Sequence, residues 1–206
     1  MDNHDNFLEA ARQLIEAGRF IDSKGWVPAT SGNFSARLAN GNIAITVSGK
    51  HKGRLQIDDI MVIDADGLSL DDRRPSAETL LHTSLYKRFP EAQAVLHPHP
   101  LHATLVSRLF GAEIALKDYE LLKAFAGITT HESRLIVPIF PNDQDISRLA
   151  GVVGSYWDTH ADCPAYIIAG HGIYTWGATV EQALCYLEAL DFLFACELRL
   201  LGVKSQ

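Results

Sequence analysis

The sequence has few of the features that mark secreted, membrane-spanning or nucleic-acid-binding proteins. Its cysteines are Cys163, Cys185 and Cys196, an odd number without a CxxC pair. Such a set argues against a disulfide framework and indicates a reducing compartment, most simply the cytoplasm. The first residues lack the cationic start and the apolar stretch of a secretory signal, so we expect no such signal.

Positive charge is also scarce. The chain has 18 lysines and arginines against 25 aspartates and glutamates, which gives a net charge of -7. The basic residues are scattered, so we expect no nucleic-acid partner.

The most hydrophobic long segment, 183–201, carries four charged residues, namely Glu188, Asp191, Glu197 and Arg199. It is therefore predicted to be a core helix, and we expect no membrane partner.

The length and composition suit one compact unit. The chain has 206 residues, of which 47% are hydrophobic, enough to bury one sizeable core. No linker, internal repeat or low-complexity segment divides it. We therefore predict a single domain over residues 1–206.

Hydrophobic periodicity and turn residues predict a mixture of helices and strands. Helices are expected over 7–23, 76–88, 101–110, 117–125, 145–160 and 179–200. Strands are expected over 35–38, 43–47, 61–63, 93–96, 134–140, 166–169 and 173–176. The Asn40-Gly41 pair between two alternating segments predicts a hairpin. Since strands and helices mix without strict βαβ alternation, we predict a three-layer α/β/α fold with a mainly antiparallel central sheet.

Histidines gather where one of these strands ends. His97 and His99 are two residues apart in an extended segment, so their side chains should share a face. A His-X-His pair alone also occurs in turns that bind nothing. His171, which stands between two glycines after another strand, supplies a third imidazole. Three protein ligands with an open position are typical of catalytic zinc. His102 lies in the first turn of the next helix, so we expect it to support or cap and not to be a ligand.

Small, hydroxylated and glycine-rich segments stand at both ends of the predicted hairpin. Residues 28–35 precede it and residues 48–53 follow it. Backbone N–H groups and hydroxyls in such loops can hold a phosphate, but the same residues are common in ordinary turns. Ser76 is a natural N-cap for the helix that follows, and Glu78 suits its first turn. A helix N-terminus with a serine hydroxyl is also an anion site.

Four of these pieces occur in one order: Thr30 to Ser35, then Ser48-Gly49, then Pro75-Ser76-Ala77-Glu78, then His97-Pro98-His99 with the distant His171. In this order the chain resembles the class II aldolase/adducin family over essentially its whole length. The resemblance implies a sugar-phosphate substrate, one zinc ion per subunit and a homotetramer. It assigns the metal to His97, His99 and His171. It assigns the phosphate to Ser31, Gly32, Asn33, Ser48, Gly49 and Ser76.

The resemblance leaves two carboxylates as candidate acid/base groups. The aldolases of the family use the glutamate that corresponds to Glu78, but Ala77 stands where their motif has a second serine. The strings 48–53 and 119–123 look most like the dehydratases of the family that act in methionine salvage, which implies that Glu120 is the acid/base. Glu78 would then orient the substrate or a metal-bound water.

The dehydratase interpretation implies a 2-keto sugar 1-phosphate as substrate. Zinc would acidify the proton at carbon 3, and the hydroxyl at carbon 4 would leave as water. A class II aldolase or epimerase acting on fuculose 1-phosphate or ribulose 5-phosphate is the alternative. A non-catalytic, adducin-like interaction module is the third, and it is the least favoured because all three histidines are present.

Overall fold

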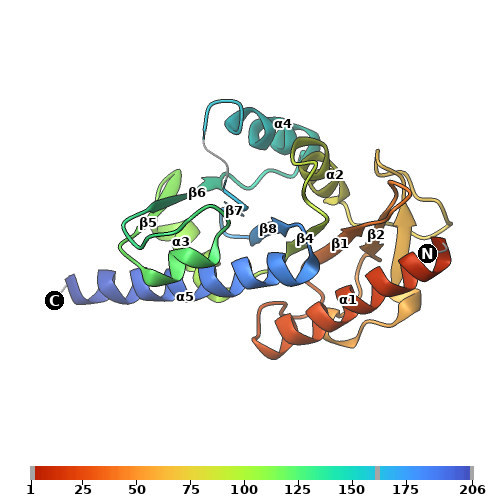
Figure 1. Cartoon of the computed structure of the whole chain (residues 1–206), viewed down its shortest axis with the longest axis horizontal. Coiled ribbons are helices and arrows are strands. Elements are labelled where there is room, and N and C mark those ends of the chain that lie inside the picture. The colour runs from red at the N-terminus through yellow and green to blue at the C-terminus, as the bar shows by residue number, and fades with distance from the viewer. Residues whose placement is uncertain (1–2, 161–162, 205–206) are drawn as a thin grey trace.

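An eight-stranded sheet runs through the centre of the chain in the computed structural model, which describes residues 3–160 and 163–204 (Figure 1). The strand order is β3-β2-β1-β4-β8-β7-β6-β5. The strands are β1 (Asn33–Arg37), β2 (Ile43–Thr46), β3 (Ile60–Ile63), β4 (Ala94–His97), β5 (Glu113–Lys117), β6 (Arg134–Phe140), β7 (Ala165–Ile168) and β8 (Ile173–Gly177). Neighbours β6 and β7 are parallel, and every other adjacent pair of the sheet is antiparallel.

Helices cover both faces of this sheet. The α-helices are α1 (Asn3–Ser23), α2 (Thr79–Arg88), α3 (Leu101–Leu109), α4 (Ile146–Tyr156) and α5 (Val180–Lys204), with short 3-10 turns η1 (Lys52–Arg54), η2 (Ile57–Asp59) and η3 (Glu120–Ala124). Figure 1 shows α1, α3 and α5 on one side of the strands and α2 and α4 on the other. The predicted three-layer α/β/α fold with a mainly antiparallel sheet is confirmed.

The central strands are apolar on both faces because each face is covered by helices. All four residues of β4 and all five residues of β8 are buried. Helix α5 packs on β4 and β8, and α1 packs on β1 and β2. This rigid centre positions the site, since β4 ends at His97 and β8 begins two residues after His171.

The hairpin predicted around Asn40-Gly41 is present as β1 and β2, with Arg37 opposite Ile43. Gly41 has φ 86°, a left-handed conformation that glycine adopts without steric cost. The pairing of β1 with β4 then places Asn33 opposite His97. The hairpin therefore brings the first glycine-rich loop to the histidine end of β4.

Four predicted elements differ from the structure, and one of them, the helix expected over 145–160, ends at Tyr156 as α4. The helix expected over 117–125 is a 3-10 turn, and strand β5 precedes it with Ile114 and Leu116 buried in alternation. In a 3-10 turn side chains three apart share a face, so buried Leu122 and Phe125 imitate a helical period. Helix α2 begins at Thr79 and not at Ser76, and α5 continues past Gly202 to Lys204. Across the described residues, none of the helices combines the length and apolar content that crossing a bilayer requires.

Candidate metal centre and phosphate pocket

Two adjacent antiparallel strands carry the histidines to one point. His97 is the last residue of β4, and His99 follows in a turn where its backbone N–H donates to the Trp26 carbonyl at 2.7 Å. His171 lies in the tight turn between β7 and β8, which is tied to β4 by a 3.1 Å hydrogen bond from Ile173 N–H to the Pro98 carbonyl. Backbone hydrogen bonds thus fix all three histidine positions.

The three imidazoles lie close enough together for one metal ion to contact all of them. Their candidate ligand nitrogens all lie within 4.8 Å of one another, and Nε2 of His97 is 3.1 Å from Nε2 of His99. Two nitrogens on one tetrahedral zinc would lie about 3.3 Å apart, given Zn–N bonds of about 2.0–2.1 Å. Nδ1 of His97 is 2.9 Å from the Ile173 carbonyl, so Nδ1 donates to that oxygen and Nε2 is the ring atom left to face a metal. The donor set fits a borderline cation such as zinc.

Burial keeps two of these rings in the neutral form that metals bind. Desolvation and the neighbouring histidine charges lower the pKa of His99 to about 3. The same causes lower the pKa of His171. The ring of His97 stacks on Tyr174 with 4.0 Å between centroids, which fixes its plane. At neutral pH these imidazoles would bind a cation without first releasing a proton.

Two glycines allow the histidines to pack this closely. A Cβ atom on Gly172 would lie 2.5 Å from the Pro98 carbonyl oxygen and 2.6 Å from Cδ2 of His99. A Cβ atom on Gly32 would lie 2.5 Å from the His97 carbonyl oxygen, and its φ of 77° favours glycine as well. Any side chain at Gly172 must therefore push the turn away from β4.

Replacing Gly172 with alanine is expected to disturb the metal centre. The added methyl group should displace His99, lower metal occupancy and cost about 1–3 kcal/mol of unfolding free energy, as overpacking usually does. Gly151→Ala is the matched control, because a Cβ atom there meets nothing within 4 Å. Metal analysis and thermal unfolding of both variants test this. Full metal content in Gly172→Ala would show that the close packing is not needed.

Glu78 faces the histidines from the start of α2. One carboxylate oxygen is 3.2 Å from Nε2 of His97, and the other is 3.3 Å from Nε2 of His171. Burial alone would raise the pKa of Glu78, but the charge and hydrogen bond of His97, with His171 and Asn33, outweigh it and hold the pKa well below its usual range. Glu78 is thus an anion at the mouth of the histidine group.

The capping roles expected for this segment are corrected. Glu78, not Ser76, occupies the N-cap position of α2, and its side chain makes no capping hydrogen bond. Ser76 lies in the turn before the helix, where its hydroxyl accepts from the Glu78 N–H at 3.3 Å. The Glu78 carboxylate is consequently free to face the histidines.

A chain of buried hydrogen bonds holds Asn33 in place. Its Nδ2 donates to Glu78 at 2.8 Å and to Ser76 at 3.3 Å. Its Oδ1 contacts Nε2 of His82, which is completely buried, and Nδ1 of His82 is 2.7 Å from the Ser35 hydroxyl. Burial lowers the pKa of His82 to about 3, so the neutral ring donates through Nε2 and accepts at Nδ1. This pattern fixes which way the Asn33 amide points.

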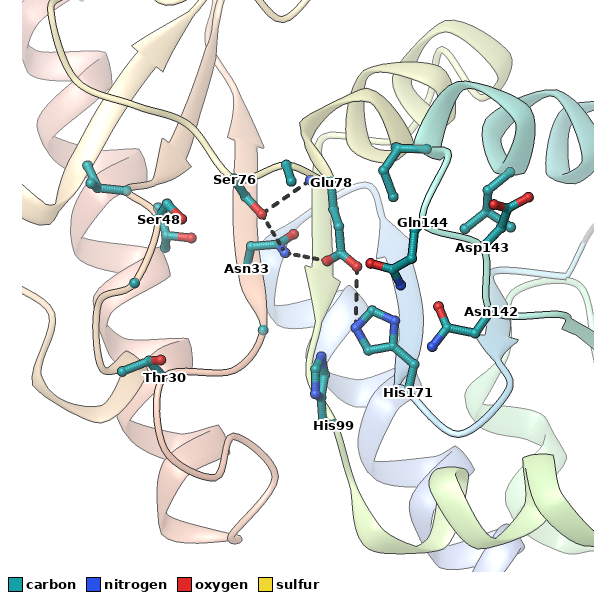
Figure 2. Close-up of a pocket in the computed structure, with 17 residues that line it drawn as sticks. Thr30, Asn33, Ser48, Ser76, Glu78, His99, Asn142, Asp143, Gln144 and His171 are labelled. Carbon is teal, nitrogen blue, oxygen red and sulfur yellow. Dashed lines mark hydrogen bonds and ion pairs between the residues drawn. The ribbon is translucent and has the colours of Figure 1, made fainter.

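A pocket of about 320 Å³ opens beside the histidines (Figure 2). Its lining combines the two glycine-rich loops, the start of α2 and the segment after β6; the residues are Thr30, Gly32, Asn33, Thr46, Val47, Ser48, Gly49, Ser76, Ala77, Glu78, His99, Asn142, Asp143, Gln144, Ile146, Leu149 and His171. Five of the six predicted phosphate residues line it. The sixth, Ser31, does not, and its hydroxyl is buried without a hydrogen-bond partner.

The segment that follows β6 contributes residues that no sequence motif indicated. In Figure 2, Asn142, Asp143 and Gln144 lie across the pocket from Thr30 and Ser48, with His171 between the two sides. They are there because β6 runs parallel to β7, so the segments that follow the two strands leave the sheet at the same edge. The polar run at 142–144 directly after a strand was the available signal.

Glu120 and His102 lie outside this pocket. Glu120 is on η3, its side chain is exposed, and Lys123 donates to its carboxylate at 2.6 Å. It lines a separate groove beside Phe192 of α5. His102 lies in the first turn of α3, as predicted, and its Nδ1 is 3.0 Å from the Asp191 carboxylate. Within one chain the glutamate that reaches the histidines is Glu78.

Comparison with known proteins agrees with this geometry. Residues 12–198 match the family model described as class II aldolase and adducin N-terminal domain. The chain is 63% identical to the methylthioribulose-1-phosphate dehydratase of Methylococcus capsulatus, with 98% of this chain and 99% of the relative covered. It is 54% identical to the protein of the same name from Pseudomonas paraeruginosa, with the same coverage.

Solved structures share the fold at lower identity. YgbL of Klebsiella pneumoniae superposes with a TM-score of 0.80 at 21% identity, over 95% of this chain and 91% of that one. The L-fuculose-1-phosphate aldolase of Thermus thermophilus superposes with a TM-score of 0.76 at 24% identity, over 97% of each chain. At these identities the likeness concerns the fold alone.

Proposed function

Because the chain belongs to the family of class II aldolase and adducin N-terminal domains, we propose that it is a methylthioribulose-1-phosphate dehydratase. The observation that carries the proposal is a group of three converging histidines beside a pocket lined by two glycine-rich loops, in a chain 63% identical to a protein of that name. The dehydratase predicted from the sequence agrees with these relatives. The reaction removes water from 5-methylthioribulose 1-phosphate and yields 2,3-diketo-5-methylthiopentyl 1-phosphate.

The metal assigned to the site is zinc, one ion per subunit, held by His97, His99 and His171. When bound, such an ion supplies a Lewis acid that polarises the substrate ketone and so acidifies the proton at carbon 3. The 3.1 Å approach of two Nε2 atoms, the neutral rings of His99 and His171 and the absence of a thiolate among the three described ligands support zinc over softer metals.

The glycine-rich loops and Ser76 are assigned to the substrate phosphate. Gly32, Ser48 and Gly49 line one side of the pocket, where backbone N–H groups and a hydroxyl can donate to phosphate oxygens. Asn33 and Ser76 share a hydrogen bond at 3.3 Å and stand between these loops and Glu78. Phosphate held here would place the ketone toward the histidines.

Changing Asn33 or Ser76 to alanine should weaken substrate binding and leave the metal in place. Both side chains line the pocket on the side assigned to the phosphate, and losing one hydrogen bond to a charged group costs about 1.5–3 kcal/mol, or roughly 10- to 100-fold in affinity. Substrate KM and zinc content of each variant, with exposed Ser155→Ala as control, provide the test. Loss of zinc with unchanged substrate affinity would contradict the assignment.

The acid/base role is assigned to Glu120, although it lies outside the pocket of its own chain. Its carboxylate is exposed on η3 next to exposed Leu121, and exposed Phe192 lines the same groove, an apolar surface suited to contact with another subunit. In a homo-oligomer Glu120 would then serve the pocket of a neighbouring copy. The hydrogen bond from Lys123 lowers its pKa, so it is ionised and able to accept the carbon 3 proton.

Glu78 takes the orienting role. Its carboxylate is held in one position by Asn33 and by His97 and His171, which suits it to orient the substrate or a metal-bound water. After Glu120 has taken the carbon 3 proton, it returns a proton to the carbon 4 hydroxyl, which leaves as water.

A class II aldolase or epimerase on a sugar phosphate is the second candidate. The observation in its favour is that Glu78, where the resemblance puts the aldolase acid/base, is the glutamate beside the histidines. Against it stands the identity to dehydratases over 98% of the chain, compared with 24% to a solved fuculose-1-phosphate aldolase. An adducin-like module without activity would have no use for three converging imidazoles.

Three further assignments belong to the same proposal. A single domain over residues 1–206 is supported by the continuous eight-stranded sheet. A homotetramer is supported by the family resemblance and by the exposed apolar residues on η3 and α5. A cytoplasmic location is supported by the free thiols of Cys163, Cys185 and Cys196.

Substrate choice tests the proposal. Purified, zinc-loaded protein should consume methylthioribulose 1-phosphate with loss of water and should release no triose phosphate from fuculose 1-phosphate. The two substrates are assayed side by side at equal enzyme concentration. Release of dihydroxyacetone phosphate from fuculose 1-phosphate, with no turnover of methylthioribulose 1-phosphate, would establish the aldolase instead.

A further inference from the structure

The phosphate pocket has an unbalanced charge. Its lining contains the carboxylates of Glu78 and Asp143, and no lysine or arginine is among the described residues that line it. A sugar phosphate brings close to two more negative charges at neutral pH. The histidine end of the pocket would hold the metal, but the loops that face the phosphate offer only hydroxyls and backbone groups.

Lys52 stands directly behind these loops. It belongs to the short turn η1, and only 1% of its surface is exposed. Its ammonium donates to the Thr30 carbonyl at 3.0 Å and to the Lys50 carbonyl at 2.6 Å. Thr30 and Gly49, the neighbour of Lys50, both line the pocket. One buried ammonium thus joins the two loops that are assigned to the phosphate.

The Lys52 ammonium has no acidic partner in the described part of the chain. The nearby carboxylates have other neighbours: Asp59 pairs with Lys50 at 2.8 Å, and Asp22 lies 3.9 Å from Nε2 of His51. Burial lowers the pKa of Lys52 to about 8, and its charge reaches far enough to lower the pKa of His99. An ammonium that is buried without a counter-ion is costly to keep, so a ligand anion that compensates it binds more tightly.

We propose that Lys52 is the cation of the phosphate subsite, which holds the two loops in register and supplies the positive charge that the pocket lining lacks. The proposal deepens the proposed function and rests on it for the identity of the phosphate ester. It concerns a positioning residue, because Lys52 is not among the residues that line the pocket and its ammonium donates to the Thr30 and Lys50 carbonyls of the two loops.

The test is the affinity of the zinc-loaded protein for inorganic phosphate, measured by calorimetry, in Lys52→Met. Methionine keeps an unbranched apolar chain and removes the charge. Phosphate affinity and substrate KM should each worsen about tenfold or more, as expected for losing one partly desolvated charge, while kcat and zinc content stay within a few-fold. Lys50→Met is the matched control, since it removes an exposed charge from the same loop and should change phosphate affinity less than about twofold.

The outcomes separate this proposal from the assigned reaction. Phosphate affinity does not depend on which reaction follows, so a protein that binds phosphate through Lys52 but fails to dehydrate would overturn the function and keep this site. Equal phosphate affinity in Lys52→Met and the parent would overturn the site. Equal losses of kcat, zinc content and phosphate affinity in Lys52→Met would overturn the site as well, because they would show that Lys52 only supports the packing of the fold.

A second measurement uses the parent protein and does not need the variant to fold. Binding of a dianion beside an ammonium must raise the pKa of that ammonium, by linkage. Burial lowers the pKa of Lys52 to about 8, so in protein carrying ¹³C-labelled lysine its signal should titrate below those of the other lysines and move to higher pH when phosphate is added. A pKa that stays the same at saturating phosphate would overturn the proposal.

Discussion

Glu120→Gln is expected to lose most dehydratase activity while keeping its metal and its stability. Glutamine preserves the shape of the side chain but cannot take the carbon 3 proton, and losing a placed general acid/base costs about 10²- to 10⁴-fold in rate. Glu120 is exposed and its partner is Lys123, so the fold should not suffer. Single-turnover rates on methylthioribulose 1-phosphate are measured for Glu120→Gln and Glu78→Gln side by side. Glu113→Gln, an exposed carboxylate on neighbouring β5, is the control.

Subunit mixing then tests from which copy Glu120 acts. Glu120→Gln subunits retain intact histidines, and subunits that lack His97 and His99 retain Glu120. Co-expressed, the two inactive variants should form oligomers with some complete sites and recover activity. If Glu120→Gln stays within a few-fold of the parent while Glu78→Gln is inactive, the acid/base is Glu78 and the aldolase-like mechanism takes its place.

The second large effect is expected from removing two ligands. The His97→Ala/His99→Ala variant should retain almost no zinc, because one imidazole and a carboxylate cannot replace the three-nitrogen group. Activity should fall to background with the metal. Elemental analysis of purified protein, which should give about one zinc per chain in the parent, measures the first effect directly.

The control for this variant is His160→Ala, which removes an exposed histidine outside the pocket. It should keep its zinc and its activity. Since His97 is fully buried and stacks on Tyr174, the ligand variant should also lose some thermal stability. Full zinc occupancy in the ligand variant would refute the assignment of the metal site.

Local patterns were sufficient to predict several parts of the fold and the site. The Asn40-Gly41 turn identified the hairpin, and the spacing of His97 and His99 correctly placed both imidazoles together. The glycines beside His171 indicated a tight turn, and Gly172 is needed there because the His99 ring packs against it. In each case the chemistry of a few adjacent residues determines the local geometry.

Other parts depend on contacts between distant segments, and a local pattern does not show where those segments meet. Asn142 and Gln144 reach the pocket because β6 pairs with β7, and a parallel pairing leaves no turn signal between its strands. Lys52 is buried because helix α1 packs over η1, the turn to which Lys52 belongs. The two approach so closely that a Cβ atom on Gly18 of α1 would lie 2.4 Å from the carbonyl oxygen of Lys52. Strand β5 was not predicted because its alternation of apolar and polar residues is short and buries only Ile114 and Leu116.

The fate of isotopic labels tests the dehydratase assignment most directly. Methylthioribulose 1-phosphate is prepared with deuterium at carbon 3 and ¹⁸O in the carbon 4 hydroxyl, and the products are analysed by mass spectrometry. Dehydration breaks the carbon 3–hydrogen and carbon 4–oxygen bonds, so the product should keep its five-carbon chain, lose both labels and release ¹⁸O-labelled water. Dihydroxyacetone phosphate that retains the deuterium, together with an ¹⁸O-labelled aldehyde, would show cleavage of the carbon 3–carbon 4 bond and contradict the assignment.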